Sequence, residues 1–339
     1  MKKRVLSGIQ PTGTLHFGNY FGAVQNWVHL QNDYECFYSI VNYHAMTMPF
    51  KAKNLTENTW DLAFSLLALG VKPECLFIQS LVPEHTELSW ILNCFTPYGE
   101  LGRMTQFKDK GEQARETDSE AFVSTGLFTY PVLQAADILL YKADFVPVGK
   151  DQEQHLELTR GIAARFNHQT ETDYFALPKP LLTETPKIVS PADPTKKMSK
   201  SLGEKHIISV FETEERLRKQ IKSAVTDSGE PSTKTDTTPT MSAGIENLFT
   251  LLKACGDHEN HAALQHDYQQ NTLKYGFLKE KVADALVLKT RQFNENRQAV
   301  LTHKKQVKEQ IQDSSAAIRR VAHTTLREVK TLCGLTNIK

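Results

Sequence analysis

The first half of the chain alternates short apolar runs with longer amphipathic stretches. The runs have the length of strands and are apolar at nearly every position: Val5–Ile9, Cys36–Val41, Cys75–Ile78 and Phe145–Val148. Apolar residues recur at helical spacing in the stretches Tyr20–Leu30, Leu55–Leu69, His85–Cys94 and Tyr130–Tyr141. Strands that are apolar on both faces and alternate with helices are typical of a parallel sheet covered on both sides. We therefore predict a Rossmann-like, doubly wound α/β fold.

The second half loses this alternation after about Gly203, and helical spacing dominates. A polar segment with Gly and Pro, Thr226–Met241, predicts a loop. Helices are predicted at Glu212–Ala224, Gly244–Lys253, Glu259–Gln269 and Leu278–Phe293. A final helix has an apolar face formed by Ile318, Val321, Ala322, Leu326, Val329 and Leu332. We predict an α/β domain over 1–203 and a mostly α-helical domain over 204–339, whose last helix has a face suited to packing back on the first domain.

Charge is distributed unevenly along the chain. The net charge is +1, but the part from Lys289 onward holds 11 Lys and Arg against 4 Asp and Glu, a net charge of +7. A basic end on a nearly neutral protein favours a polyanionic partner, although a solvated helix face explains it about as well.

The remaining composition excludes several classes of protein. The five cysteines form no CxxC pair, which argues against a zinc knuckle or a disulfide framework and favours scattered buried thiols. No run approaches the ~20 apolar residues that span a bilayer. The basic N-terminus is not followed by the apolar core of a signal peptide. We therefore expect a cytoplasmic protein without a membrane partner.

A turn rich in Gly and Pro follows the first predicted strand, and a helix begins close to Gly18. The free N–H groups at the start of a helix favour phosphate, and a glycine there lets a nucleotide approach the backbone. His16 and Asn19 lie on either side as neutral donors. On its own, this segment is also compatible with a structural turn that contains a core histidine.

A second segment with phosphate-binding chemistry, Lys197-Met198-Ser199-Lys200-Ser201, lies in a loop after Pro194. Lysine is a mobile point charge, which suits a phosphate that moves during a reaction, and serine adds small donors. A solvated charged loop would have the same composition, so this segment alone leaves both interpretations open.

Together, the two segments resemble the paired signatures of the class I aminoacyl-tRNA synthetases. His16-Phe17-Gly18-Asn19 is similar to the HIGH motif of that family, and Lys197–Ser201 matches its KMSKS motif. Asn19 at the last position is typical of the tryptophanyl branch. Further segments resemble the bacterial members of that branch: Ser7–Gly13, Met104–Lys110, Ala135–Tyr141, Val146–Gly149, Asp151-Gln152 and His155–Arg160.

This resemblance implies a tryptophan–tRNA ligase activity. Such an enzyme activates L-tryptophan with ATP, releases pyrophosphate, charges tRNA(Trp) and works as a homodimer whose helical domain reads the anticodon. The alternative is a tyrosyl-tRNA synthetase-like enzyme, because the spacing of Tyr130, Gln134 and Asp137 also occurs in that branch. Against it, this chain lacks the Asp-Gln-Trp-Gly segment typical of the tyrosyl enzymes.

The resemblance also implies roles for individual residues. Asp137 is expected to accept the indole N–H, and the other residues expected around tryptophan are Gln10, His44, Tyr130 and Gln152. The residues expected around ATP are Gln10, Pro11, Thr12, His16, Gly18, Asn19, Gly149, Lys150, Asp151, Ile188, Lys197, Met198, Ser199, Lys200 and Ser201. The family commonly has Glu in place of Lys150 and Asp-Gln in place of Asn42-Tyr43, so these positions depart from its pattern.

Catalysis is expected to consist of positioning and charge stabilisation, because the amino acid carboxylate itself attacks the α-phosphate. The expected catalytic residues are Lys110, Lys197, Lys200 and Ser201. Neither of the two phosphate-binding segments contains an acidic residue, whereas a protein cage for a metal would require several. We therefore expect no metal site in the protein itself, with Mg²⁺ held mainly by the ATP phosphates.

Overall fold

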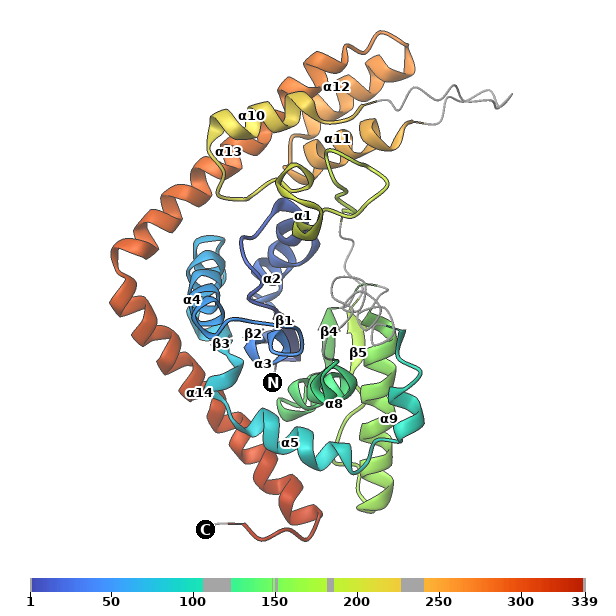
Figure 1. Cartoon of the computed structure of the whole chain (residues 1–339), viewed down its shortest axis with the longest axis vertical. Helices are drawn as coiled ribbons and strands as arrows, with labels where there is room; N and C mark the ends of the chain where they lie inside the picture. The colour runs from blue at the N-terminus through green and yellow to red at the C-terminus, as the bar shows by residue number, and fades with distance from the viewer. Residues whose placement is uncertain are drawn as a thin grey trace, which may run out of the picture.

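A parallel sheet lies at the centre of the first half of the chain (Figure 1). The computed structural model describes residues 2–105, 123–147, 149, 152–181, 186–226 and 241–337. Within them, the sheet consists of β1 (Arg4–Ile9), β2 (Glu35–Ile40), β3 (Leu76–Ile78), β4 (Phe145–Pro147) and β5 (Lys179–Leu181). Their order is β3-β2-β1-β4-β5. The order reverses between β1 and β4, and doubly wound sheets bind ligands at such a switch point, at the carboxyl ends of the strands.

The strand predictions are confirmed for β1 to β4, with shifts of one or two residues at their ends. Strand β5 is not predicted by the apolar pattern. Its three residues, Lys-Pro-Leu, include two exposed side chains, so they form no apolar run. β5 pairs with β4 at the edge of the sheet, where a proline is tolerated.

Helices cover both faces of the sheet. The main ones in this half are α2 (Gln25–Leu30), α4 (Ala52–Ala68), α5 (Glu84–Asn93), α8 (Thr125–Leu140) and α9 (Glu153–Gln169); the shorter ones are α1 (Phe17–Asn19), the π-helix η1 (Tyr20–Val24), α3 (Asn42–Ala45) and α6 (Tyr98–Leu101). Alternate side chains of β2 enter different cores. Tyr38 packs in the cluster with α2 and α4, whereas Phe37 packs in the cluster with α5 and α8. The cavity described below lies on the face of the sheet that α8 covers.

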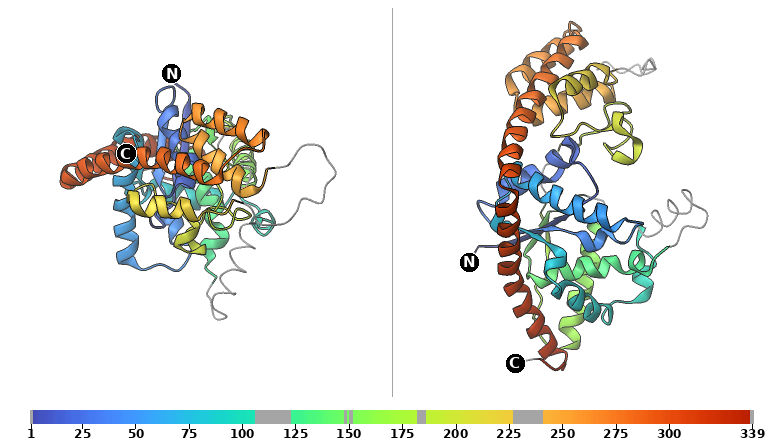
Figure 2. Two further views of the ribbon diagram at one scale, coloured as in Figure 1. Left: turned by 90° about the horizontal axis from the view of Figure 1, so that it is seen from above. Right: turned by 60° about the vertical axis from the view of Figure 1, so that its left-hand side comes forward.

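The second half is helical, as predicted. It consists of α10 (Glu214–Ser223), α11 (Ala243–Ala254), α12 (His258–Gln269), α13 (Tyr275–Thr302) and α14 (Lys304–Leu332). Helices α10 and α11 pack on α13, which also contacts α4. Figures 1 and 2 show α13 and α14 following one another along one side of the molecule. No helix among the described residues is both long and apolar enough to span a membrane.

Helix α14 packs back on the α/β unit through its predicted apolar face. Ile318, Ala322, Leu326 and Val329 are buried in the cluster that contains α5 and α8. The Ser314 hydroxyl donates to the Leu76 carbonyl at 2.6 Å, and Arg319 pairs with Glu84 at 2.9 Å. The chain end is therefore attached to the sheet through β3 and α5. The division at residues 203 and 204 remains a prediction.

The prediction of buried thiols holds for Cys36 and Cys75 and is wrong for Cys94. Cys94 is the C-terminal cap of α5, where the helix ends at the surface, and its thiol is exposed. The sequence pattern around a single cysteine does not indicate whether its side chain faces the core or the solvent at the point where a helix ends.

Candidate active site

A cavity of about 440 Å³ lies at the carboxyl ends of β1 and β2, between these strands and α8. Its lining includes six residues that the sequence indicates: Gln10, His44, Tyr130, Asp137, Gln152 and Lys197. Leu6 and Gly8 of β1 and Ser39 of β2 form the wall on the sheet side. Residues expected for the amino acid and for ATP thus line one cavity at the switch point of the sheet.

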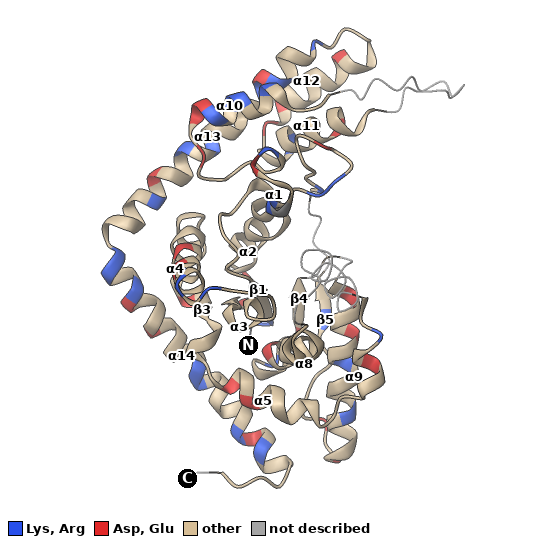
Figure 3. Cartoon of the chain, in the orientation of Figure 1, with Lys and Arg blue, Asp and Glu red and all other residues tan. Residues whose placement is uncertain are grey.

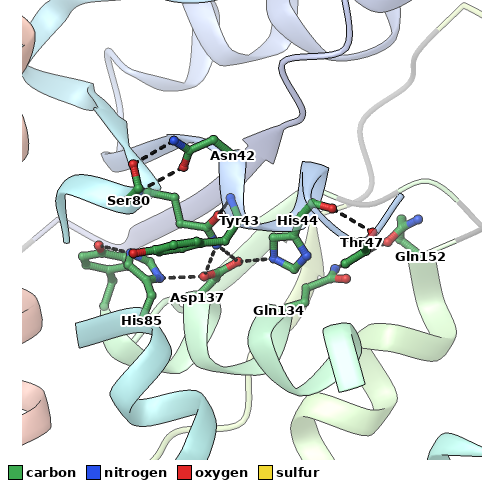
Figure 4. Close-up of polar contacts among 11 residues, drawn as sticks. Asn42, Tyr43, His44, Thr47, Ser80, His85, Gln134, Asp137 and Gln152 are labelled. Atoms are coloured by element: carbon green, nitrogen blue, oxygen red, sulfur yellow. Dashed lines mark hydrogen bonds and ion pairs between the residues drawn. The ribbon is translucent and has the colours of Figure 1, made fainter. Parts of the chain in front are cut away.

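Asp137 lies at the centre of a buried hydrogen-bond network, and its exposed fraction is 3% (Figure 4). Its Oδ2 is 2.7 Å from Nε2 of His44, and its Oδ1 is 2.6 Å from Nδ1 of His85. The Gln79 amide donates to Oδ1 at 2.8 Å and to Oδ2 at 3.0 Å. Burial acts to raise the pKa of Asp137, but His85 and His44, which contact its two carboxylate oxygens, hold it well below its usual range. The carboxylate is therefore ionised.

Tyr130 and Gln152 lie on the same cavity wall. The Tyr130 hydroxyl is 2.7 Å from Nε2 of the buried His155. Burial raises the pKa of Tyr130 to about 12, so the hydroxyl keeps its proton near neutral pH. The Gln134 amide donates to Oε1 of Gln152 at 3.4 Å, which is a long contact. This wall offers uncharged polar groups beside the charged Asp137.

The two phosphate-binding segments meet in space, as their pairing predicts. The Lys200 ammonium donates to the Thr12 carbonyl at 2.9 Å. A Cβ placed on Gly18 would lie only 3.3 Å from Cβ of Met198, so a glycine there allows the Lys197–Ser201 loop to approach. The bridge between His16 and Ser209 joins the same two regions. Two segments separated by most of the α/β unit therefore form one site.

His16 caps α1. Its Nδ1 accepts from the backbone N–H of Asn19 at 3.2 Å, while the Asn19 side chain accepts from the backbone N–H of His16 at 3.3 Å. Burial, followed by the charges of Lys200 and Lys197, lowers the pKa of His16 to about 4. The ring is therefore neutral at pH 7, and because Nδ1 accepts, its proton is on Nε2. The neutral donor expected at this position agrees with this geometry, and its role toward ATP stays a prediction.

Lys200 has an unusual ionisation for an ammonium group. Burial lowers its pKa to about 8, and the carboxylate of Asp61 only partly opposes this. Lys197 is exposed and lines the cavity. The two lysines therefore differ, since one is partly desolvated and bonded to a carbonyl while the other faces solvent at the cavity.

The segment around Ile188 is fixed by α11. The Val189 N–H donates to Oδ1 of Asn247 at 3.0 Å, and the Asn247 amide donates back to the Val189 carbonyl at 3.2 Å. Ile188 itself is 5% exposed and packs in the core that contains α2 and α11. Its side chain thus holds the segment in place, and the contact to ATP expected at Ile188 remains an expectation.

Comparison with known proteins decides the family. Residues 1–288 match the family of tRNA synthetases class I (W and Y). This chain belongs to that family. A tryptophan–tRNA ligase of Clostridium tetani is 41% identical over 337 residues, which cover 98% of this chain and 96% of that protein.

Solved synthetase structures share the whole fold. The tryptophanyl-tRNA synthetase of Mycoplasma pneumoniae superposes with a TM-score of 0.85 at 35% identity and covers 99% of both chains. The Campylobacter jejuni enzyme, complexed with ADP and tryptophan, gives a TM-score of 0.81 at 36% identity and covers 98% of this chain and 100% of that one.

Several residues of this synthetase that surround Asp137 were not identified from the sequence: Gln79, His85, Tyr141 and Ser39. Gln79 directly follows the third apolar run. Polar residues at the carboxyl end of a parallel strand are candidates for a ligand site, and this position could have indicated Gln79. Tyr141 follows Asp137 by four residues, which places both on one side of a helix. Ser39 lines the cavity with 1% exposure, and its Oγ has no hydrogen-bond partner among the described residues.

Some of the expected synthetase residues lie outside the described residues. These are Lys110, Lys150 and Asp151, together with most of the Met104–Lys110 segment. For Ser201 the structure describes the backbone, in the short helix η5 (Lys200–Leu202), but not the side chain. Gly149 is described and exposed. The roles assigned to these residues remain expectations.

Metal-binding chemistry has no obvious protein site in the parts of this synthetase that the structure describes. There, no group of three or more His, Cys, Asp or Glu side chains could hold an ion. The described residues thus do not fit a protein-bound metal, and no step below is derived from one.

Proposed function

We propose that this chain is a tryptophan–tRNA ligase that forms tryptophanyl-adenylate in the cavity between β1, β2 and α8. The observation that carries the proposal is the cavity itself, which has an ionised, buried Asp137 at one side and Lys197 at another. A carboxylate selects an N–H donor on the amino acid, and lysine charge suits the phosphates of ATP. Charging tRNA for protein synthesis is a cytoplasmic task, so the activity agrees with the expected location.

Asp137 receives the indole N–H of tryptophan. An ionised carboxylate has about four lone-pair directions. His44 occupies one on Oδ2 and His85 one on Oδ1, while the Gln79 amide lies closer to Oδ1. The Gln79 amide also donates to Oδ2, at the longer distance of 3.0 Å, so the indole N–H would share or displace that bond. Gln10, Tyr130 and Gln152 supply polar contacts for the rest of the amino acid, since all three line the cavity.

ATP binds between the turn at Gln10–Asn19 and the Lys197–Ser201 loop. The carboxylate of tryptophan attacks the α-phosphate, and the pyrophosphate leaves. Lys197 and Lys200 stabilise the negative charge that develops on the leaving group. The neutral His16 donates a hydrogen bond from Nε2. Mg²⁺ enters with the ATP phosphates as part of the substrate, because the described residues offer no cage for it.

The tyrosine alternative has less support. The relatives at 41% and 36% identity that are described above carry tryptophan in their names. Asp137 alone does not separate the two amino acids, because a carboxylate accepts from a phenol as readily as from an indole. The names of these relatives are therefore what favours tryptophan over tyrosine.

The partner tRNA(Trp) and a homodimer belong to the same proposal. Figure 3 shows Lys and Arg spread along α13 and α14. Among the described basic residues from Lys289 onward, the side chains of Lys305, Arg320 and Arg327 are exposed and form no ion pair, so they are available to phosphate. Large exposed hydrophobic side chains at Trp90 and Tyr98, 74% and 80% exposed, suit a second copy of the chain.

The test is ATP–pyrophosphate exchange measured with each of the twenty amino acids, followed by charging of tRNA(Trp). The proposal expects exchange that depends on tryptophan and is far weaker with tyrosine and phenylalanine. Exchange that is equally fast with tyrosine would support the alternative branch. Sedimentation of the wild type and of Trp90→Ala tests the homodimer, which the substitution should weaken.

A further inference from the structure

A buried chain of polar side chains lies behind Asp137, on the side away from the cavity (Figure 4). Gln79, His85 and Tyr141 are each 0% exposed, and none of them lines the cavity. They come from three elements: the turn η3 (Gln79–Leu81) after β3, helix α5, and the end of α8. Because they cannot reach a substrate, any effect they have on binding must pass through Asp137.

Asp137 and Tyr141 together fix which nitrogen of His85 carries the proton, because the ionised carboxylate beside Nδ1 can only accept. The Tyr141 hydroxyl lies 2.8 Å from Nε2 of His85. Burial, with the nearby charges of Asp137 and Glu84, raises the pKa of Tyr141 well above its ordinary value, so the hydroxyl remains a donor. When Nε2 accepts that proton, the ring hydrogen must be on Nδ1. Nδ1–H then donates to Oδ1 of Asp137, 2.6 Å away.

Gln79 is oriented by the backbone. Its Oε1 accepts from the Tyr43 N–H at 3.0 Å, which leaves the amide nitrogen facing Asp137. Asn42 holds the next residue of the same turn, because its side chain accepts from the Ser80 N–H at 3.0 Å and donates to the Ser80 hydroxyl at 2.7 Å. The departure from the family pattern at Asn42 and Tyr43 thus falls beside the turn that carries Gln79, where Tyr43 acts through its backbone and Asn42 through Ser80.

We propose that Gln79, His85 and Tyr141 are positioning residues that make Asp137 selective for a ring N–H donor. Gln79 and His85 donate to the carboxylate and Tyr141 contacts His85, so that the orientation of the carboxylate toward the amino acid is fixed. This inference rests on the proposed function, in which Asp137 binds the indole N–H. A site whose buried polar groups are arranged for one hydrogen bond discriminates strongly against an analogue that lacks the donor.

The rival interpretation is that the three residues only fill the core. The two interpretations differ for 3-(benzothiophen-3-yl)alanine, which has the shape of tryptophan but a sulfur atom in place of the N–H group. Damage to the core lowers kcat/KM for both amino acids equally. Loss of positioning lowers it for tryptophan far more, so the ratio of the two kcat/KM values reports on positioning alone.

The experiment measures that ratio by pyrophosphate exchange in the wild type and in four variants. His85→Leu removes the donor, and His85→Asn restores one at the position of Nδ1. Tyr141→Phe removes the hydroxyl that helps to fix the tautomer while keeping the ring. Tyr38→Phe is the matched control, because Tyr38 is equally buried and its hydroxyl bonds to the Trp27 carbonyl on the other face of the sheet.

The ratio should fall about tenfold in His85→Leu, since a lost hydrogen bond to a charged group has roughly that effect. It should fall about threefold in Tyr141→Phe and stay within about twofold of wild type in His85→Asn and Tyr38→Phe. The KM for ATP should not change. An unaltered ratio in both His85→Leu and Tyr141→Phe overturns the inference. A wild-type ratio near one would instead refute the proposed role of Asp137, so the two failures are distinguishable.

Discussion

The two parts of the proposed site are built in different ways. Where we propose that the amino acid binds, Asp137 is 3% exposed and contacts His44, Gln79 and His85, all from the α/β unit. Where we propose that ATP binds, Lys200 reaches Thr12 across 188 positions of sequence through one hydrogen bond. A charge fixed by several buried partners suits recognition of one ligand. A partly desolvated lysine with one carbonyl partner is able to exchange that partner for a phosphate. We therefore expect substitutions of Asp137 to change selectivity for the amino acid and substitutions of Lys200 to change the rate of adenylate formation.

Lys200→Ala should have the largest effect, because it removes charge where negative charge develops in the transition state. We expect kcat for pyrophosphate exchange to fall roughly 100- to 1,000-fold, as for loss of one preorganised donor. The KM for tryptophan should change little, since Asp137 is untouched. Steady-state exchange at varied tryptophan concentration measures both. A normal kcat with a raised KM for tryptophan would assign this loop to amino acid binding instead.

Asp137→Asn should come next and act at the other part of the proposed site. Its amide places an N–H group among three donors, so one hydrogen bond to a buried charge is lost and one donor is left unpaired. We expect kcat/KM for tryptophan to fall roughly ten- to a hundredfold and the free energy of unfolding to fall by about 1–3 kcal/mol. Exchange kinetics and denaturant titration measure these effects. Wild-type kcat/KM would remove Asp137 from the tryptophan site.

The ionisation of Lys200 gives a smaller and pH-dependent effect. Since its pKa is lowered to about 8 and the charged form is needed, activity should be full below pH 8 and lost as pH rises through that value. At pH 9, kcat/KM for ATP should be about tenfold below its plateau, because this constant reports on the free enzyme. Lys200→Arg should move this decline to higher pH, since arginine stays charged. A pH profile unchanged by that substitution would assign the decline to another group.

The smallest effect is expected outside the cavity, on α14. Lys304 and Lys308 lie over the rings of Phe64 and Trp60, at 5.7 and 4.9 Å, so they also serve packing. We therefore choose Lys305→Gln with Arg320→Gln. Charging of tRNA should weaken, and its log–log salt slope should become shallower by about 0.9 for each phosphate that is no longer neutralised. Adenylate formation should be unaffected.

The control for this pair is Glu309→Gln on the same helix, which changes the charge in the opposite direction. It should leave charging unchanged or strengthen it. Equal weakening of tRNA charging by both changes would mean that the substitutions disturb the helix itself and not only its charge. If charging is not weakened at any salt concentration, the basic residues form only a solvated helix face.

The sequence predicted the parts of this molecule that depend on local pattern. The apolar stripe from Ile318 to Leu332 specified the packing of α14, and the two phosphate-binding segments specified which loops meet. Gln79, His85 and Tyr141 could not be predicted in the same way, because their chemistry arises only when three elements come together around Asp137. His85 reads as a polar residue at the start of a helix, and only the folded chain buries it completely. The edge strand β5 was missed because its pairing, rather than its composition, makes it a strand.

The most direct test of this division is equilibrium binding of tryptophan, measured by titration calorimetry in the absence of ATP. The account predicts that Asp137→Asn weakens binding by roughly tenfold or more, whereas Lys200→Ala leaves the Kd within about threefold of wild type. Tryptophan binding that is lost in Lys200→Ala and retained in Asp137→Asn would contradict it.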